Sequence, residues 1–429
     1  MIFLYRIIYP VFFLILSPYY LKRMIKRGGY GKKLKYRLGF WPRLPDKDSK
    51  RTRIWIQAVS VGELSSIHSI LHSFLSSSNF EIVLSGTTST GQKIAEQKYS
   101  KELLASGPFP LDWFPFSWLT WSRIKPDLAI CVDSELWPEH MYQAKKKGIP
   151  FCIINGRLSD RSYNRLRKLG IFQNLLIPKH LQILAASATQ EIRWQEIGVA
   201  KDNTFSTGNL KIDISPATPP SDSKKDQRKK ELGFPASSLV LAGISTWPGE
   251  EKLLLDVLQE IRQTKIDARL LLIPRHAERR NEVKSTLSAF SFTYRQRTLP
   301  SNNTSECIVY LADTTGELID LIEGADIGFL GKTLPPRDEG QNPIEPVSMG
   351  IPLVIGPACT NFPETCQELV ICGAAQQGDS IESVMEHLHS LIENEELRLQ
   401  MKKAGLKWRQ EQGSPTEKTI DKLLEFCKN

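Results

Sequence analysis

The strongest constraint on the fold is a series of short apolar runs that alternates with helical stretches and occurs twice. In the first half the runs are RIWIQAV (53–59), EIVLSG (81–86), DLAICV (127–132), PFCIIN (150–155) and QILAAS (182–187). In the second half they are SLVLAGI (238–244), ARLLLIP (268–274), CIVYLA (307–312), DIGFLG (326–331) and PLVIG (352–356). Such runs are typical of strands buried on both faces of a parallel sheet. The sequence therefore predicts an α/β protein with two Rossmann-like, doubly wound domains, and a ligand cleft between their facing carboxyl edges.

The composition predicts a linker between the two series. Residues 215–235 are rich in Pro, Ser and Lys and contain no large apolar residue before Leu232. A chain of 429 residues is also too long for one ordinary core. The predicted parts are an N-terminal segment 1–40, a domain 41–214, a linker 215–235, a second domain 236–405 and a C-terminal helix 406–429, with a helix break near Gly413.

The cysteines exclude two kinds of site. The seven cysteines are scattered singly, and no CxxC or Cys/His cluster occurs. We therefore expect neither a disulfide framework nor a structural zinc site, and the pattern suits a reducing compartment.

The amino terminus has the pattern of a membrane anchor. Residues 7–21 are apolar and aromatic, eight Lys and Arg follow between Lys22 and Arg37, and no acid precedes Asp46. The apolar run is shorter than the roughly 20 residues of a spanning helix and contains two prolines. A cleavable signal peptide is disfavoured because most of the charge follows the run and no small-x-small site is present. We expect a signal-anchor or monotopic insertion at the inner membrane, with the domains cytoplasmic; a buried hairpin is the alternative.

Polar motifs follow successive strands of the first half. Glu63 lies where the strand 53–59 meets a helix, and it could act as a general base or only complement the helix dipole. Asp133 and Glu135 stand two apart after the strand 127–132, beside Trp137-Pro138. The segment 155–159 (NGRLS) follows the next strand, and Lys211 closes the half. Each could be a turn, a cap or a surface charge, but their recurrence favours a site.

The second half repeats this arrangement. The segment 245–251 (STWPGEE) opens a helix whose amides could hold a phosphate, although its two acids argue equally for dipole compensation. Arg275 ends the strand 268–274 and is well suited to gripping a phosphate. The segment 313–318 (DTTGEL) joins another strand to a helix. Asn342, Pro343 and Glu345 match the N-cap, N1 and N3 positions of a helix start, and Glu345 could also bind ribose hydroxyls.

Taken in order, these motifs resemble those of the 3-deoxy-D-manno-octulosonic acid (Kdo) transferases of lipopolysaccharide synthesis. The first half carries RLGFWP (37–42), AVSVGE (58–63), SGTTSTG (85–91), ELWP (135–138), NGRLSDRS (155–162) and GNLKID (208–213). The second half carries ST and GEE within 245–251, PRHAER (274–279), DTTGEL (313–318) and NPIEP (342–346). The resemblance runs from the amino terminus to about residue 375, and the ordered set is more specific than any single motif.

The resemblance implies a GT-B fold, a CMP-Kdo donor and a lipid A precursor (lipid IVA) as acceptor, with inverting, metal-independent transfer and no cofactor. It implies that domain 41–214 binds the acceptor and that domain 236–405 binds the nucleotide sugar. Glu63 would be the catalytic base, and Asp133 and Lys211 would stabilise the transition state. The residues implied to hold CMP are Pro274, Arg275, Thr315, Gly316, Glu317, Asn342, Pro343, Ile344 and Glu345.

The chain departs from the family pattern at three places. Asp133-Ser134-Glu135 stands where the family has Glu-Thr-Glu, which removes one methylene at a proposed catalytic position. Gly331-Lys332-Thr333 replaces Gly-Gly-Ser. Glu339-Gly340-Gln341-Asn342 replaces Gly-Gly-His-Asn. The last two changes border the expected donor site.

Three other functions compete. The nearest is a GT-B enzyme that transfers a hexose from a UDP-sugar to a lipid, which cytidine and uridine nucleotides would distinguish. A membrane tether with a vestigial site is disfavoured by the presence of Glu63, Arg275 and Glu345. A nucleic-acid-binding protein is the weakest alternative, because the basic cluster adjoins an apolar segment and no recognition motif occurs.

Overall fold

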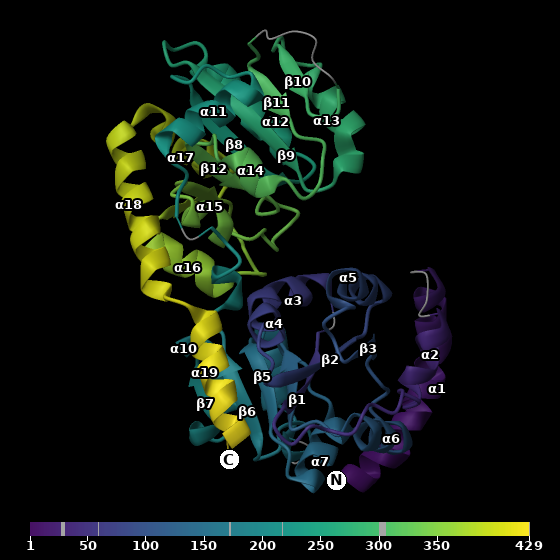
Figure 1. Cartoon of the computed structure of the whole chain (residues 1–429). Coiled ribbons are helices and arrows are strands. Elements are labelled where there is room, and N and C mark those ends of the chain that lie inside the picture. Colours follow the sequence, from purple (N-terminus) through teal and green to yellow (C-terminus); the bar gives the residue numbers. More distant parts are fainter. Residues whose placement is uncertain (27–30, 59, 171–172, 217, 300–305, 429) are drawn as a thin grey trace. The chain divides into compact units, whose positions relative to one another are not determined.

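The computed structural model describes residues 1–26, 31–58, 60–170, 173–216, 218–299 and 306–428, and the chain forms two compact units (Figure 1). Unit 1 comprises Met1–Ile214 and Ser414–Asn429, and unit 2 comprises Ser215–Gly413. Each unit contains one seven-stranded sheet in which all paired strands are parallel. The predicted α/β class with two doubly wound domains is therefore confirmed.

The sheet of unit 1 has the strand order β3-β2-β1-β4-β5-β6-β7. Its strands are β1 (Thr52–Gln57), β2 (Phe80–Gly86), β3 (Ala105–Pro108), β4 (Leu128–Val132), β5 (Phe151–Gly156), β6 (Leu181–Ala185) and β7 (Thr204–Ser206). The helices are α1 (Ile2–Lys26), η1 (Gly31–Lys33), α2 (Leu34–Arg37), α3 (Val61–Ser66), α4 (His68–Leu75), α5 (Ser89–Tyr99), α6 (Phe114–Ile124), α7 (Pro138–Lys147), α8 (Asp160–Arg167), α9 (Gln173–Leu176), α10 (Ala188–Glu196), η3 (Lys201–Asn203), η4 (Leu210–Ile212) and α19 (Pro415–Lys428).

The sheet of unit 2 has the strand order β10-β11-β9-β8-β12-β13-β14. Its strands are β8 (Leu239–Thr246), β9 (Ala268–Pro274), β10 (Tyr294–Gln296), β11 (Val309–Leu311), β12 (Ile327–Leu330), β13 (Leu353–Ile355) and β14 (Ala375–Gln377). The helices are α11 (Asp222–Leu232), α12 (Glu250–Ile261), η5 (Ala277–Arg279), α13 (Arg280–Leu287), α14 (Leu318–Ile322), α15 (Ile344–Ser348), α16 (Pro363–Ile371), α17 (Ile381–Glu393) and α18 (Glu395–Gln412).

Buried side chains cover the central strands on both faces. In unit 1 one core layer contains Trp41, Trp121 and Trp194, and a second contains Ile54, Ile70 and Phe74. Every residue of β4, β5 and β9 is buried, as expected for strands covered on both sides. Such cores hold the strand ends, and the loops that leave them, in fixed positions.

The segment 215–235 differs from the predicted linker, because it contains helix α11 of unit 2. Ser221 caps this helix by accepting a hydrogen bond from the Lys224 backbone N–H. The helix has almost no apolar stripe and is held by charge instead. The Lys229 ammonium lies 2.9 Å from Asp326 and donates to the Ser238 carbonyl oxygen at 2.7 Å. Because this helix is held by ion pairs and not by an apolar face, the composition of the segment did not predict it.

The carboxyl-terminal stretch also divides differently from the predicted helix 406–429. The predicted break near Gly413 is confirmed, since α18 ends at Gln412 and α19 begins at Pro415. Helix α19 belongs to unit 1, where Leu423 is fully buried in the core. The Thr416 backbone N–H donates to the Asp213 carboxylate at 2.5 Å, and Thr419 hydrogen-bonds Thr207 at 3.0 Å.

Candidate functional site

The candidate residues of unit 1 emerge from the carboxyl edge of its sheet. The strand order reverses between β1 and β4, which are adjacent and parallel. Glu63 follows β1, and Asp133 directly follows β4. Ligands of doubly wound sheets bind at such a switch point, where the loops of two neighbouring strands diverge. The structure thus brings these two predicted residues to one functional edge.

Glu63 lies in the first turn of α3 and remains partly exposed. Ser60 is the N-cap; its hydroxyl accepts from the Glu63 N–H at 3.3 Å and donates to the Glu63 carboxylate at 3.1 Å. These bonds fit a capping role, but they also hold the carboxylate at the edge of the sheet. Val59 of the same motif lies outside the described residues.

Asp133 and Asn155 form a strained, hydrogen-bonded pair at the ends of β4 and β5. Both adopt left-handed backbone conformations, with φ of 63° and 53°. The buried Asn155 side chain donates to Asp133 at 2.7 Å, and its oxygen accepts from the Leu210 N–H at 3.1 Å. Arg157 adds a contact to Asp133 at 3.4 Å. Asn155 therefore links Asp133 to the segment that carries Lys211.

Left-handed residues are concentrated at the two carboxyl edges. Of the five non-glycine residues with positive φ in the described part of the chain, four lie at or just beyond strand ends: Asp133, Asn155, Ser245 and Lys332. Such conformations cost about 1–3 kcal/mol each and persist where the surroundings impose them. Their positions mark both edges as candidate functional surfaces.

Glu135 is a carboxyl group that the motif analysis did not include among the catalytic candidates. Its Oε2 accepts from the Trp137 indole N–H at 2.9 Å and from Gln57 at 3.5 Å. Gln57 is held in turn by the Ser85 hydroxyl at 2.8 Å. Burial, and then the neighbouring Glu63 carboxylate, raise the pKa of Glu135 to about 7, although the Trp137 hydrogen bond lowers it. Glu135 and Glu63 are thus two electrostatically coupled acids.

In unit 2 a buried carboxylate connects the two loops at the switch point between β8 and β12. Glu250, at the start of α12, accepts from the backbone N–H of Trp247, Lys332, Thr333 and Leu334 at 2.8 to 3.4 Å. Burial raises the pKa of Glu250, while these hydrogen bonds lower it. The carboxylate thus occupies amides that could otherwise bind an anion, which favours a structural role for the acids of the segment 245–251.

The predicted phosphate-binding residues lie at the ends of two neighbouring strands. Pro274 ends β9 and Arg275 follows it, while Thr315 and Gly316 lie beyond the adjacent β11. Arg275 is exposed, and within the described residues its guanidinium has no hydrogen-bond or ion-pair partner. Gly316 has a φ of 88°, which favours glycine there. This group combines a free cation with an exposed loop.

Glu317 is held more tightly than the motif suggests. Its carboxylate pairs with Arg297 at 2.7 Å and accepts from the Thr314 hydroxyl. The Arg297 hydrogen bond is the main reason that the pKa of Glu317 is lowered. Glu317 therefore fixes the loop that presents Thr315 and Gly316.

The predicted helix start at Asn342 is present. The Asn342 side chain accepts from the Ile344 N–H at 3.2 Å, as expected of an N-cap, although α15 itself begins at Ile344, after Pro343. Pro343 and Ile344 are buried, and Glu345 lies partly exposed in the first turn. The capping interpretation and a ligand-binding role for Glu345 are both compatible with this geometry.

Two departures from the family pattern contact each other. The Lys332 ammonium lies 2.7 Å from the Glu339 carboxylate and 4.7 Å from the centroid of the Trp247 ring. The Arg337 guanidinium carbon lies 4.3 Å from the centroid of the same ring. The ion pair joins the loop after β12 to the loop before Asn342, where the family pattern has glycines. Across the described residues, no cluster of three or more His, Cys, Asp or Glu side chains is suited to a metal ion.

Comparison with known proteins gives a consistent result. A family model described as 3-deoxy-D-manno-octulosonic-acid transferase matches residues 32–214. The chain is 27% identical to the 3-deoxy-D-manno-octulosonic acid transferase of Haemophilus influenzae over 99% of both chains. It is 27% identical to the protein of the same name from Chlamydia pneumoniae, over 92% of this chain and 89% of that protein.

Two further similarities extend the comparison. The chain is 30% identical to a bifunctional glycosyltransferase/methyltransferase of Fusobacterium nucleatum over 80% of its own length, but it spans only 53% of that protein. A solved UDP-GlcNAc 2-epimerase from Neisseria meningitidis superposes with a TM-score of 0.59 at 14% identity, covering 87% of this chain and 100% of the epimerase. At that identity the epimerase shows the fold alone, which is of the GT-B type.

Proposed function

Because the chain belongs to the family of Kdo transferases and is a glycosyltransferase of lipopolysaccharide biosynthesis, we propose that it moves Kdo from CMP-Kdo onto lipid IVA. The observation that carries the proposal is the arrangement at the carboxyl edge of unit 1. Glu63 and Asp133 leave adjacent strands, and Asn155 ties Asp133 to the segment of Lys211. Similarity over nearly the whole chain supports the choice of sugar.

The acceptor reacts at unit 1 in this proposal. Glu63 takes the proton of the attacking lipid hydroxyl as that oxygen bonds to the anomeric carbon of Kdo. Asp133 stabilises the positive charge that develops on the sugar ring, and Lys211 steadies the anionic groups of the donor. Attack from the face opposite the departing CMP inverts the anomeric configuration. A product that re-enters as acceptor would receive further Kdo residues in succession.

The donor nucleotide binds unit 2 in this proposal. Arg275 is the best-supported contact, since its exposed guanidinium is free to form paired hydrogen bonds with the CMP phosphate. The leaving group is stabilised there without a metal ion or cofactor. The other proposed CMP contacts are Pro274, Thr315, Gly316, Glu317, Asn342, Pro343, Ile344 and Glu345. The reaction takes place at the cytoplasmic side of the inner membrane.

Mass spectrometry of the lipid product tests this function. Detergent-solubilised protein is incubated with lipid IVA and either CMP-Kdo or a panel of UDP-sugars, with and without EDTA. We expect masses higher by one or more Kdo units with CMP-Kdo alone, unchanged by EDTA. A hexose-bearing product from a UDP-sugar would replace this function with the competing lipid hexosyltransferase, and loss of activity in EDTA would refute the metal-free mechanism.

A further inference from the structure

Helix α1 packs one face against unit 1 and leaves the other uncovered. The partly buried positions include Ile2, Tyr5, Tyr9, Phe13 and Ser17, which recur every three or four residues and so share one side of the helix. Tyr5, Tyr9 and Phe13 form a continuous aromatic row, with ring centroids 5.4 and 6.2 Å apart. These rings contact one another within the helix, and Tyr5 and Arg6 join the start of α1 to the rest of the unit. Helix α1 runs at the edge of unit 1 (Figure 1).

The first turn of α1 is fixed to the domain by two buried acids. The Arg6 guanidinium makes paired hydrogen bonds to Glu139 at 2.8 and 2.9 Å, and the Glu139 side chain is fully buried. The Tyr5 hydroxyl donates to Asp112 at 2.6 Å, and Asp112 is 1% exposed. The Trp113 indole N–H donates to the Arg6 carbonyl oxygen at 2.9 Å. Breaking these contacts would leave the buried Glu139 carboxylate without the cation that pairs with it, so the turn stays docked.

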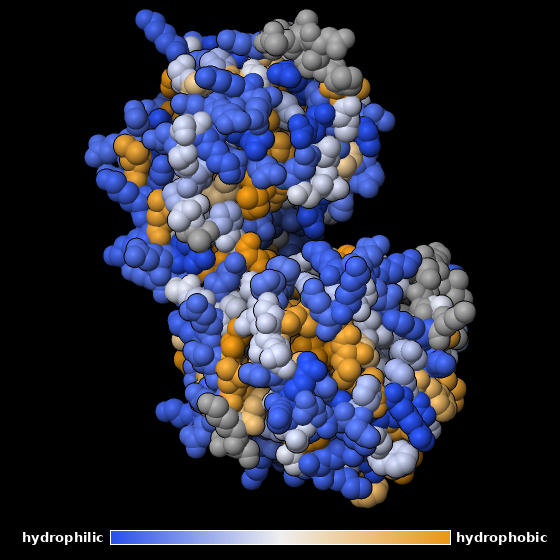
Figure 2. Space-filling model, viewed as in Figure 1, coloured by the Kyte–Doolittle hydropathy of each residue, from blue (hydrophilic) through white to orange (hydrophobic). Residues whose placement is uncertain are grey.

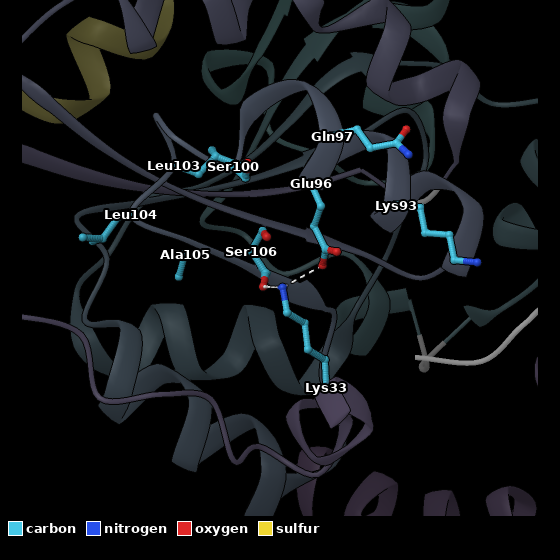
Figure 3. A pocket seen from close by; sticks show the side chains of 9 residues that line it. All are labelled: Lys33, Lys93, Glu96, Gln97, Ser100, Leu103, Leu104, Ala105 and Ser106. Atoms are coloured by element: carbon cyan, nitrogen blue, oxygen red, sulfur yellow. Dashed lines mark hydrogen bonds and ion pairs between the residues drawn. The ribbon is translucent and has the colours of Figure 1, made fainter. Parts of the chain in front are cut away.

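The chain returns to the same unit directly after α1. The Lys33 ammonium donates to the Glu96 carboxylate at 2.6 Å and to the Ser106 carbonyl oxygen at 3.0 Å, across a polar cavity of about 530 Å³ (Figure 3). The buried Arg37 side chain donates to the Phe109 carbonyl oxygen at 2.6 Å. Both ends of the helical segment are thus tied to one folded unit.

These two attachments conflict with a spanning helix. A helix of 25 residues is about 37 Å long at 1.5 Å per residue, enough to cross a hydrocarbon core of about 30 Å. If α1 crossed the bilayer, the turn at Arg6 and the segment at Lys33 would lie on opposite sides of it. Glu139 and Asp112 would then have to reach through the membrane to hold the first turn. One folded unit cannot occupy both sides.

The uncovered face of α1 is nevertheless suited to lipid. One helix in the described part of the chain, Ile2–Tyr19, is long and apolar enough to cross a membrane by length and composition, with a mean hydropathy of 1.6. Its exposed large side chains include Phe3, Ile7, Leu14 and Ile15, each about 70% exposed. Apolar residues gather at the rim of unit 1 where α1 runs (Figures 1 and 2). The exposed side chains of Lys22 and Lys35, at and beyond the end of the apolar run, carry the charge that suits acidic headgroups.

We propose that α1 does not span the bilayer but lies in the plane of one leaflet, with its outer face in the lipid and both of its ends on the side of the catalytic units. The outer face of α1 therefore contacts the acyl chains of a single leaflet. Interfacial helices usually turn a polar, charged face away from the lipid, and in α1 the side that carries Tyr5 and Arg6 is turned to the folded unit instead. This inference concerns topology and is independent of the sugar transferred.

Depth measurements along α1 test the proposal. Nitroxide labels are placed singly at Leu4→Cys, Val11→Cys and Pro18→Cys, which are exposed and seven residues apart and so share the outer side of the helix, in a Cys372→Ser, Cys427→Ser background. Asp202→Cys serves as a solvent-exposed control in unit 1. The protein is reconstituted in vesicles of phosphatidylethanolamine and phosphatidylglycerol, and exposure to oxygen and to a water-soluble nickel complex is measured. We expect similar, shallow depths at positions 4, 11 and 18, and a fully aqueous label at 202.

A depth maximum at position 11, with positions 4 and 18 near opposite surfaces, would overturn the proposal in favour of a spanning helix. Labels that stay aqueous, or that are shielded equally without lipid, would overturn it in favour of a water-facing or self-associating surface.

A second measurement needs no labels. A protease-cleavable epitope before Met1 should be removed in inside-out inner-membrane vesicles and protected in spheroplasts. Cleavage in spheroplasts only would refute the topology, whereas an inactive but correctly inserted protein would refute only the proposed function.

Discussion

Replacing Glu135 with Gln should make the protein more stable at alkaline pH while leaving its acid stability unchanged. Glu135 is held beside Glu63, and burial with this neighbour raises its pKa to about 7 from an ordinary 4.5. At low pH the group is protonated in both the folded and the unfolded chain. As the pH rises, the unfolded chain releases the proton first, so the native state loses stability until the pH exceeds about 7. Gln keeps an oxygen acceptor for Trp137 and carries no charge.

The size of the effect follows from the pKa. A difference of about 2.5 pH units corresponds to about 3.4 kcal/mol, at about 1.36 kcal/mol per unit. Glu135 is only partly buried, so solvent screens part of this cost, and we expect about 2 kcal/mol at pH 8. At pH 5 the unfolded chain has already released most of this proton, so the difference between Glu135→Gln and the wild type should be about 0.8 kcal/mol.

Urea unfolding from pH 5 to pH 8 measures this difference. Seven of the nine tryptophans lie in unit 1, so indole fluorescence reports mainly the unit that contains Glu135. The exposed Glu102→Gln is the matched control, and it should follow the wild type at every pH. Parallel curves for Glu135→Gln and the wild type would refute the raised pKa of Glu135.

Three further substitutions test the two candidate edges. Arg275→Ala should weaken CMP binding at least tenfold, as measured by calorimetry. Its thermal stability should be unchanged because the side chain is exposed, and unaltered binding would remove Arg275 from the site. Gly331→Ala places a Cβ 2.3 Å from the Ser245 carbonyl oxygen, so it should destabilise unit 2 by about 1–3 kcal/mol and lower its unfolding temperature. An unfolding temperature equal to that of the wild type would contradict this close approach of the two loops. Asn155→Ala removes the hydrogen bond to Asp133 and the one from the Leu210 N–H, and it should cost about 3 kcal/mol and reduce turnover. A stable, active variant would show that this link is dispensable.

The central strands could be predicted from the sequence, but the sheet edges could not. All ten predicted runs contain a strand, whereas β3, β7, β10 and β14 were missed. These four strands form the two ends of both sheets and are only three or four residues long. An edge strand is paired on one side and less uniformly buried, so its sequence lacks the continuous apolar run that marks a central strand. Periodicity therefore predicts the middle of such sheets better than their borders.

The candidate site was predictable as a set of positions but not as a network. Strand-end motifs indicated Glu63, Asp133 and Arg275, because the topology brings strand ends to one edge. The chain itself offered a signal for Glu135, namely two acids spaced two apart beside Trp137. Its coupling to Glu63 depends on burial and on contacts across strands, which no local pattern contains. The same holds for the pairing of Lys332 with Glu339, two substitutions seven residues apart.

The most direct test of the central claim compares Glu63→Gln with the wild type for Kdo transfer and for nucleotide binding in the same preparation. The wild type should convert lipid IVA to a Kdo-bearing product. The variant should bind CMP with wild-type affinity, because the proposed nucleotide contacts lie in unit 2, yet transfer Kdo about a thousandfold more slowly. Equal rates of product formation by the two proteins would contradict the assignment of Glu63 as the base, and absence of a Kdo-bearing product from folded wild-type protein would contradict the proposed reaction itself.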